Sequence, residues 1–464
     1  MSNRESHIDL LRKILAEIEK PRGIQEEEYP FPSTLFLGDG KSISFTPRID
    51  KMLGCLSKDL MDTWFQSHKT EFTASEWTGM VRQAFGSSLC QFPELLQGSS
   101  ARSDSIHCNE MNFEEKAEAI LNGIKETIAD SVRNIQEHEY VFGCHIASIN
   151  DLEEIRIGNV LIEPRSVWLE RKHRHGKISR TSYLRIEGAW KGKKLRKRKF
   201  SRDKLQERYI LDSVGDGEFV CSIRVGPVGS EARRQKALIA ARIATATIAL
   251  GWERPSSALN SINLIFDRQP RQQNYIRFAP DGSMTEGGQL LSYLPGGLKR
   301  MTAEQWKDLR LDLCDVFDCV SETIQYVTHS HRKASRPKLA DVLFQALLWF
   351  HEGCRETMDV MAIVKFCSSM EALAGGGKSQ GIVNLIKALM KIGDEAKLRA
   401  DVKQLYGSGR SRTIHGTNVR LGHDWSSDRY LAEILAHGVL MGLLQRAVKH
   451  PESDYPQLLP ELKL

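Results

Sequence analysis

The stretch from Leu405 to Asn418 reads L-Y-G-S-G-R-S-R-T-I-H-G-T-N, and the helical patterning on either side of it breaks off here. Within it, Arg410 precedes His415 by five positions and follows two glycines. An arginine can hold a phosphate through its planar set of donors, and a histidine can move a proton near neutral pH. The pair therefore predicts chemistry on a phosphodiester.

The spacing of the pair limits how it can work. Residues five apart on a regular α-helix differ by about 140° around the axis, so Arg410 and His415 do not share one face of a straight helix. Gly407 and Gly409 predict a kink or a helix end, and a site shared between two chains would relax the constraint further. The structural alternative is an arginine that caps helix carbonyls and a histidine that is hydrogen-bonded near a turn.

The chain around this stretch is predicted to be wholly helical from residue 301 to residue 464. Apolar periodicity places helices near 302–328, 338–356, 358–374, 381–392, 395–406 and 428–448. His437 falls within an apolar helix, and we expect it to be packed or hydrogen-bonded. The tail from Pro451 to Leu464 carries prolines and is predicted to be loosely ordered.

Several features of this helical region, taken together, resemble a HEPN domain. Arg410 and His415 form an R-x4-H pattern in a late helix, they are followed by serine and glycine respectively, and Tyr406 lies upstream. The segment Ser369-Met-Glu-Ala-Leu373 at the end of an earlier helix resembles the Apea-like branch found in prokaryotic defence proteins. Active members of the wider superfamily often place Asn, Asp or His after the arginine, whereas this chain has Ser411, as is usual in that branch.

The resemblance covers residues 337–449 and implies a metal-independent endoribonuclease that needs no cofactor and acts as a homodimer through this helical bundle. In such enzymes the ribose 2′-hydroxyl attacks the adjacent phosphate and leaves a cyclic phosphate. His415 would be the general acid or base, Arg410 would stabilise the transition state, and Glu371 would orient one of them. The implied setting is antiviral defence by abortive infection, with a toxin-like nuclease acting on host or phage RNA.

A second candidate RNA-binding feature lies from Arg171 to Ile210, where sixteen lysine or arginine residues stand against three acidic ones. We predict that this basic region is a hairpin that either docks RNA or forms a solvated face. Tyr183, Trp190 and Phe200 either stack on bases or belong to the core of the sheet. The residues predicted to contact RNA are Tyr406, Ser411, Arg412, Lys193, Lys194, Arg196, Lys197, Arg198 and Lys199.

The fold class predicted from the whole pattern is α+β, with an N-terminal mixed region that contains a small antiparallel sheet and a C-terminal all-α bundle. Residues 1–139 are predicted to be mostly helical, with capping boxes at Thr73 to Glu76 and Asn112 to Glu115. Residues 97–109 are predicted to form a mobile loop. Residues 140–300 are predicted to form a domain with a helix at 231–250 and strands at 141–147, 155–162, 166–170, 178–186, 218–225, 262–266 and 275–278.

The composition of the chain indicates its cellular compartment. The nine cysteines are odd in number, scattered and without a C-x-x-C pair, which argues against a disulfide framework or zinc module and favours a reducing cytoplasm. The sequence shows no run of about 18 apolar residues, so we expect no membrane span. We expect the N-terminal region to regulate the nuclease or to bind a phage or host trigger.

Two rival functions remain open. The first is a non-catalytic HEPN module that binds nucleic acid or protein and in which Arg410 and His415 are structural. The second is a nucleotide-triphosphate-driven enzyme, suggested by Gly377-Lys378-Ser379. A phosphate loop of this kind needs a buried strand before it, and the preceding segment has helical spacing instead, so we interpret it as a turn between helices.

Overall fold

The computed structural model describes residues 7–18, 33–36, 42–66, 71–92, 112–146, 154–267, 272–290, 302–329, 334–419, 422–455 and 457–459. The loop predicted at 97–109 lies outside them. The chain is α+β, as predicted, and it divides into two compact units. The first contains Met1–Glu137 and Gly226–Arg234, and the second contains His138–Val225 and Gln235–Leu464. The domain boundary expected at residue 300 therefore falls inside the second unit.

The first unit is mostly helical, with a small hairpin of β1 (Ser33–Phe36) and β2 (Ser42–Phe45). Both predicted capping boxes are confirmed, at the starts of α3 and α4. The apolar faces of the helices meet in one core that includes Leu11, Leu53, Phe85 and Ile124, all fully buried. The helices are α1 (His7–Ile18), α2 (Pro47–Thr63), α3 (Ala74–Leu89) and α4 (Phe113–Arg133).

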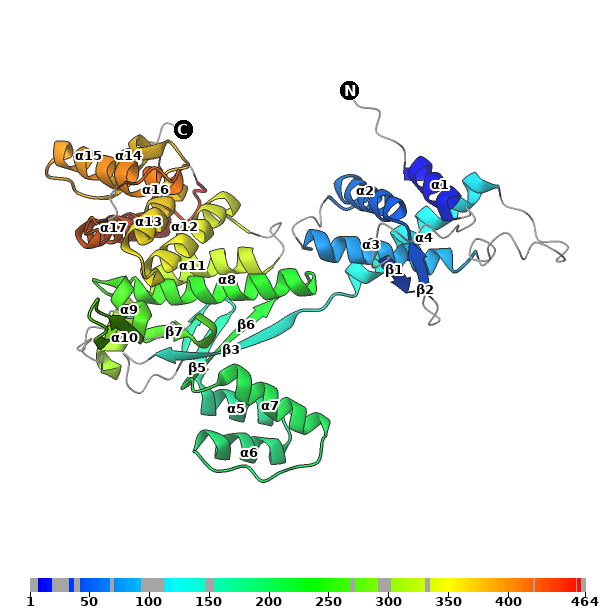
Figure 1. Ribbon diagram of the computed structural model, residues 1–464, viewed down its shortest axis with the longest axis horizontal. Helices are drawn as coiled ribbons and strands as arrows, with labels where there is room; N and C mark the ends of the chain where they lie inside the picture. The colour runs from blue at the N-terminus through cyan, green and yellow to red at the C-terminus, as the bar shows by residue number, and fades with distance from the viewer. Residues whose placement is uncertain are drawn as a thin grey trace. The chain divides into compact units, whose positions relative to one another are not determined.

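The second unit contains a five-stranded sheet in the order β4-β5-β6-β3-β7, and every neighbouring pair is antiparallel. Nearly all of β6 is buried, as expected for a strand with elements on both faces. Figure 1 shows α8 (Ser230–Ala249) between the sheet and the C-terminal helices. The strands are β3 (His138–Ile146), β4 (Ile155–Ile157), β5 (Val160–Pro164), β6 (Phe219–Val225) and β7 (Ile262–Leu264).

Three helices stand where two strands and a basic hairpin were predicted. They are α5 (Arg165–Arg174), α6 (Arg180–Trp190) and α7 (Arg202–Val214). The hydroxyl of Ser179 accepts the N–H of Ser182, and that of Ser201 accepts the N–H of Lys204, so both serines cap a helix start. The prediction of strands at 166–170 and 178–186 was wrong, and the basic cluster is the loop that joins α6 to α7.

The helical region begins after a further hairpin of β8 (Gln272–Phe278) and β9 (Met284–Leu290). The helix predicted at 302–328 is two helices that meet at Leu313, and the other predicted helices are present. Helix α17 alone among the described helices has the length and apolarity of a membrane span, and it packs here against α11, α13 and α14. The helices are α9 (Pro255–Ser261), α10 (Ala303–Asp312), α11 (Cys314–Thr328), α12 (Pro337–Arg355), α13 (Asp359–Leu373), α14 (Lys378–Leu389), α15 (Glu395–Lys403), α16 (Arg412–Ile414) and α17 (Ser426–Lys449).

The C-terminal tail is packed at residues 451–455 and 457–459, so the prediction of a loosely ordered tail was wrong for these residues. Tyr455, Leu458 and Leu459 are buried, and the Tyr455 hydroxyl donates to the carbonyl of Leu373 at 3.0 Å. Asp454 Oδ1 accepts the N–H of Leu339 at 2.7 Å, at the start of α12. Because α12 has no side-chain cap of its own, the tail supplies the missing acceptor.

Candidate functional site

The segment that carries Arg410 is a π-helix, Gln404–Ser411, which continues α15 into α16. The kink or helix end predicted at its glycines is therefore replaced by a wider helical turn. Hydrogen bonds in a π-helix join residues five apart, so such residues lie closer to one face than they do on an α-helix. Single π-turns inside α-helices occur frequently at functional sites.

Gly409 lets the π-helix lie against α13. A Cβ atom at position 409 would come within 2.8 Å of Ile363 Cγ2, whereas a Cβ atom at position 407 would meet nothing within 4 Å. Ile363 is fully buried on α13, the helix that also carries Glu371. The close approach that Gly409 permits therefore brings the π-helix next to the helix of the candidate carboxylate.

Three of the predicted site residues meet across this contact. The Arg410 guanidinium pairs with Glu371, with Nη2 and Oε2 2.6 Å apart. Its Nη1 donates to the Tyr406 hydroxyl at 3.1 Å, and this hydroxyl donates to Glu371 Oε1, also at 3.1 Å. The guanidinium carbon lies 4.9 Å from the centre of the tyrosine ring, a cation–π distance. We call Glu371, Tyr406 and Arg410 the trio.

The trio is half-buried and its charges balance. The Arg410 and Glu371 side chains are 22% and 23% exposed, so solvent can still reach the pair. Burial and, after it, the charge of Glu371 raise the pKa of Tyr406, which therefore remains a protonated donor at neutral pH. Arg410 Nε is buried and has no hydrogen-bond partner among the described residues, so this face of the guanidinium keeps an unused donor.

His415 is the C-cap residue of α16, and its side chain has no hydrogen bond or ion pair with the trio. Gly416 follows it with φ of 67°, the N–H of Thr417 bonds to the Arg412 carbonyl at 2.9 Å, and the N–H of Gly416 bonds to the Thr413 carbonyl at 3.2 Å. These bonds form a Schellman motif that stops the helix at the histidine. The His415 side chain is exposed, and within the described ranges it makes no hydrogen bond or ion pair.

The remaining residues predicted to contact RNA in this segment differ in exposure. Arg412 is exposed, and Ser411 is half-buried with its carbonyl bonded to the N–H of His415. His437, predicted to be packed or hydrogen-bonded, lies 2.9 Å from the carbonyl of Leu250 through Nε2, and burial lowers its pKa. The structure thus gathers Glu371, Tyr406 and Arg410 and leaves His415 facing solvent.

The basic loop between α6 and α7 is mostly open to solvent. One of its predicted RNA contacts, Arg198, is instead engaged with Asp203 at 3.2 Å and with the buried Glu207 at 2.5 Å. The other five are exposed: Lys193, Lys194, Arg196, Lys197 and Lys199.

The three aromatic residues near this loop fall into two groups. Tyr183 and Trp190 pack against the core formed by α5, α6 and α7, whereas Phe200 is 80% exposed and available for stacking. Figure 1 shows these helices on the opposite side of the sheet from α13 and α16. An RNA that contacts the basic loop and the trio of the same chain would therefore have to extend past the sheet.

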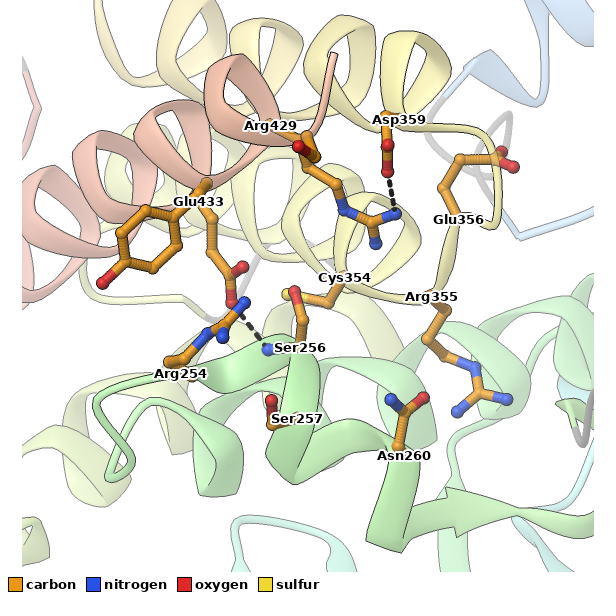
Figure 2. Close-up of a pocket in the computed structure, with 12 residues that line it drawn as sticks. Arg254, Ser256, Ser257, Asn260, Cys354, Arg355, Glu356, Asp359, Arg429 and Glu433 are labelled. Atoms are coloured by element: carbon orange, nitrogen blue, oxygen red, sulfur yellow. Dashed lines mark hydrogen bonds and ion pairs between the residues drawn. The ribbon is translucent and has the colours of Figure 1, made fainter. Parts of the chain in front are cut away.

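A polar cavity of about 170 Å³ lies at the other end of α13 (Figure 2), and sequence reasoning did not identify it. Its carboxylates have partners within the protein: Asp359 pairs with Arg429 at 2.9 Å, and Glu433 accepts the N–H of Ser256 at 2.8 Å. Glu433 is nearly fully buried. In the sequence, the available signal for this cavity was a glutamate inside an apolar helix. Because these carboxylates are paired within the protein, we interpret the cavity as part of the packing contact between α9 and the C-terminal helices.

The glycine-rich segment after α13 is a turn between helices, as we interpreted it. Gly375, Gly376 and Gly377 all have positive φ, and the element before them is a helix and not a strand. The geometry of a phosphate loop is therefore missing. In the part of the chain that the structure describes, no cluster of three His, Cys, Asp or Glu residues is placed to hold a metal ion. Comparisons with protein families, with curated proteins and with solved structures gave no match.

Proposed function

We propose that this chain is a metal-independent endoribonuclease of the HEPN type, which acts in the cytoplasm during antiviral defence by abortive infection. The observation that carries the proposal is the trio: an arginine, a carboxylate and a tyrosine from two helices join in one hydrogen-bonded set, 2.6 to 3.1 Å apart. A histidine whose side chain has no hydrogen-bond or ion-pair partner among the described residues follows at the end of the same helical path. Phosphodiester cleavage needs both a cation for the phosphate and a group that moves protons.

In the proposed reaction the ribose 2′-oxygen bonds to the adjacent phosphorus, and the bond from phosphorus to the 5′-oxygen breaks. One proton leaves the 2′-hydroxyl and another reaches the departing 5′-oxygen. His415 performs one of these transfers, and Arg410 donates to the charged phosphate oxygens. Glu371 and Tyr406 hold the guanidinium in position, so the phosphate competes with Glu371 for its donors.

The need for two proton transfers makes a second copy of the chain part of the proposal. Within the trio, Arg410 and Glu371 are paired with each other and the pKa of Tyr406 is raised, so the other transfer calls for a second histidine. A homodimer formed through the C-terminal helices would bring two copies of His415 to one cleft. The first unit is left to regulate the nuclease or to bind a phage or host trigger, and host or phage RNA is the substrate.

The runner-up is a non-catalytic module that binds nucleic acid or protein. Two observations favour it. The charge of Arg410 is already balanced by Glu371, and His415 makes no described contact with the trio. In that case the ion pair would serve to fasten the π-helix to α13.

The test is cleavage of single-stranded RNA by the full chain, with and without EDTA. We expect cleavage in EDTA, products with cyclic phosphate ends, and loss of cleavage when the attacking 2′-hydroxyl is replaced by hydrogen. His415→Ala and Arg410→Ala should each lower the rate at least about a hundredfold. His423→Ala is the matched control, because His423 is also partly exposed nearby but pairs with Asp428 at 3.3 Å.

Cleavage that survives both substitutions would sink the assignment, and a requirement for Mg²⁺ would move it to another class of nuclease. RNA binding without cleavage, unchanged by His415→Ala, would favour the non-catalytic module.

A further inference from the structure

A second and larger cavity, of about 580 Å³, lies between β3 and the helices α5 and α7. Its volume falls within the range of about 300–1,000 Å³ that is usual for ligand pockets. No part of the proposed cleavage chemistry uses it. The apolar side chains that line it are Val141, Trp168, Ile178, Leu205, Ile210 and Val214.

The floor of this pocket is continuous with the small core of α5, α6 and α7. Trp168 and Val214 are buried members of that core, while Ile210 and Val141 are half-buried above them. The Trp168 indole N–H is buried and finds no acceptor among the described residues. The pocket therefore presents an aromatic and aliphatic floor.

The rim of the pocket is cationic. Lys172 is paired with Glu139, but Lys177 and Arg202 are exposed and make no ion pair with any residue in the described ranges. Arg202 is the first residue of α7 and directly follows the basic loop, with the exposed Phe200 two positions before it. The positive charge of the loop thus continues to the mouth of the pocket.

From this arrangement we infer that the pocket binds one nucleotide, with its base on the apolar floor and its phosphate against Lys177 and Arg202. A base offers a flat face to apolar and aromatic side chains. A phosphate suits lysine and arginine donors on an exposed rim. A nucleotide within single-stranded RNA and a free mononucleotide present the same base and phosphate. The inference rests on the proposed function only if the nucleotide belongs to RNA.

The test measures binding of a fluorescent single-stranded RNA octamer, and separately of AMP and UMP, to the full chain. His415→Ala is the background, so that RNA stays intact. We expect Lys177→Glu with Arg202→Glu to weaken RNA binding about tenfold or more. The matched control is Lys204→Glu with Arg208→Glu, which changes the net charge equally on exposed positions of α7 that do not line the pocket. The control should lose much less affinity.

A second variant tests the floor. Leu205→Trp fills the pocket from a half-buried position on α7 without removing a core side chain, and its fold can be checked by circular dichroism. We expect a folded Leu205→Trp chain to lose RNA binding, and mononucleotide binding if free nucleotides are the source. Equal losses in the two charge variants, or unchanged affinity of Leu205→Trp for both RNA and mononucleotides, would overturn the inference. RNA bound here by a wild-type chain that does not cleave it would refute only the proposed nuclease.

Discussion

The contact between Gly409 and Ile363 gives a sharp test of how the candidate site is held together. In Gly409→Ala the new methyl group would lie 2.8 Å from Ile363 Cγ2, while in Gly407→Ala it would meet nothing within 4 Å. Ile363 is fully buried and β-branched, so it cannot move aside cheaply. Overpacking of this kind costs about 1–3 kcal/mol.

The comparison of the two variants isolates that cost. Both replace a glycine within the same helical segment, so both gain the same helix propensity, about 1 kcal/mol, and this gain cancels in the difference. Hydrogen exchange of peptides covering residues 359–373 and 404–416 measures the local free energy of opening. A difference of about 1–3 kcal/mol makes exchange roughly 5- to 150-fold faster in Gly409→Ala than in Gly407→Ala. Equal protection in the two variants would refute the close-packing argument.

Three further predictions concern stability and are checked by urea or thermal unfolding of the second unit. Asp454→Ala should cost about 0.5–2 kcal/mol because it uncaps α12, whereas Asp454→Asn, which keeps one of the two acceptors, should cost less. Glu433→Leu should cost about 1–3 kcal/mol by leaving the buried Ser256 N–H without an acceptor, and Glu433→Gln should cost less. The neighbouring His351 and nearby cations lower the pKa of Glu352 from 4.5 to about 2, so its contribution should be present above pH 4.5 and lost as the pH falls towards 2. Glu352→Gln should flatten the stability profile in that window.

The sequence predicted elements well where local signals and burial agreed. In the capping boxes that begin at Thr73 and Asn112, the reciprocal hydrogen bonds join residues three positions apart. They can therefore be predicted from the local sequence alone. The strands at 166–170 and 178–186 failed because isoleucine and tryptophan there suggested extended runs. In the structure Ser182 and Ile186 are buried four apart on one helical face, and Ser179 is an N-cap that could have revealed the helix.

The tail and the π-helix lay beyond prediction for a different reason. Asp454 caps a helix more than 100 residues earlier in the chain, and no local pattern encodes such a contact. The close approach of Gly409 in the π-helix to Ile363 on α13 is equally non-local. By contrast, Tyr406 and Arg410 are four residues apart, so their hydrogen bond follows from helical geometry once that segment is helical.

The ion pair within the trio changes what the five-residue spacing means. On the sequence alone, the spacing argued that Arg410 and His415 cannot face one phosphate from one straight helix. The structure gives Arg410 a carboxylate partner at 2.6 Å and buries its unused Nε, so a phosphate must compete with Glu371 for the guanidinium. Because His415 is exposed at the helix end formed by the Schellman motif, the proposed reaction needs a second surface to enclose it. In a single chain Arg410 would then stay paired with Glu371, and assembly with another copy would be the step that completes the cleft.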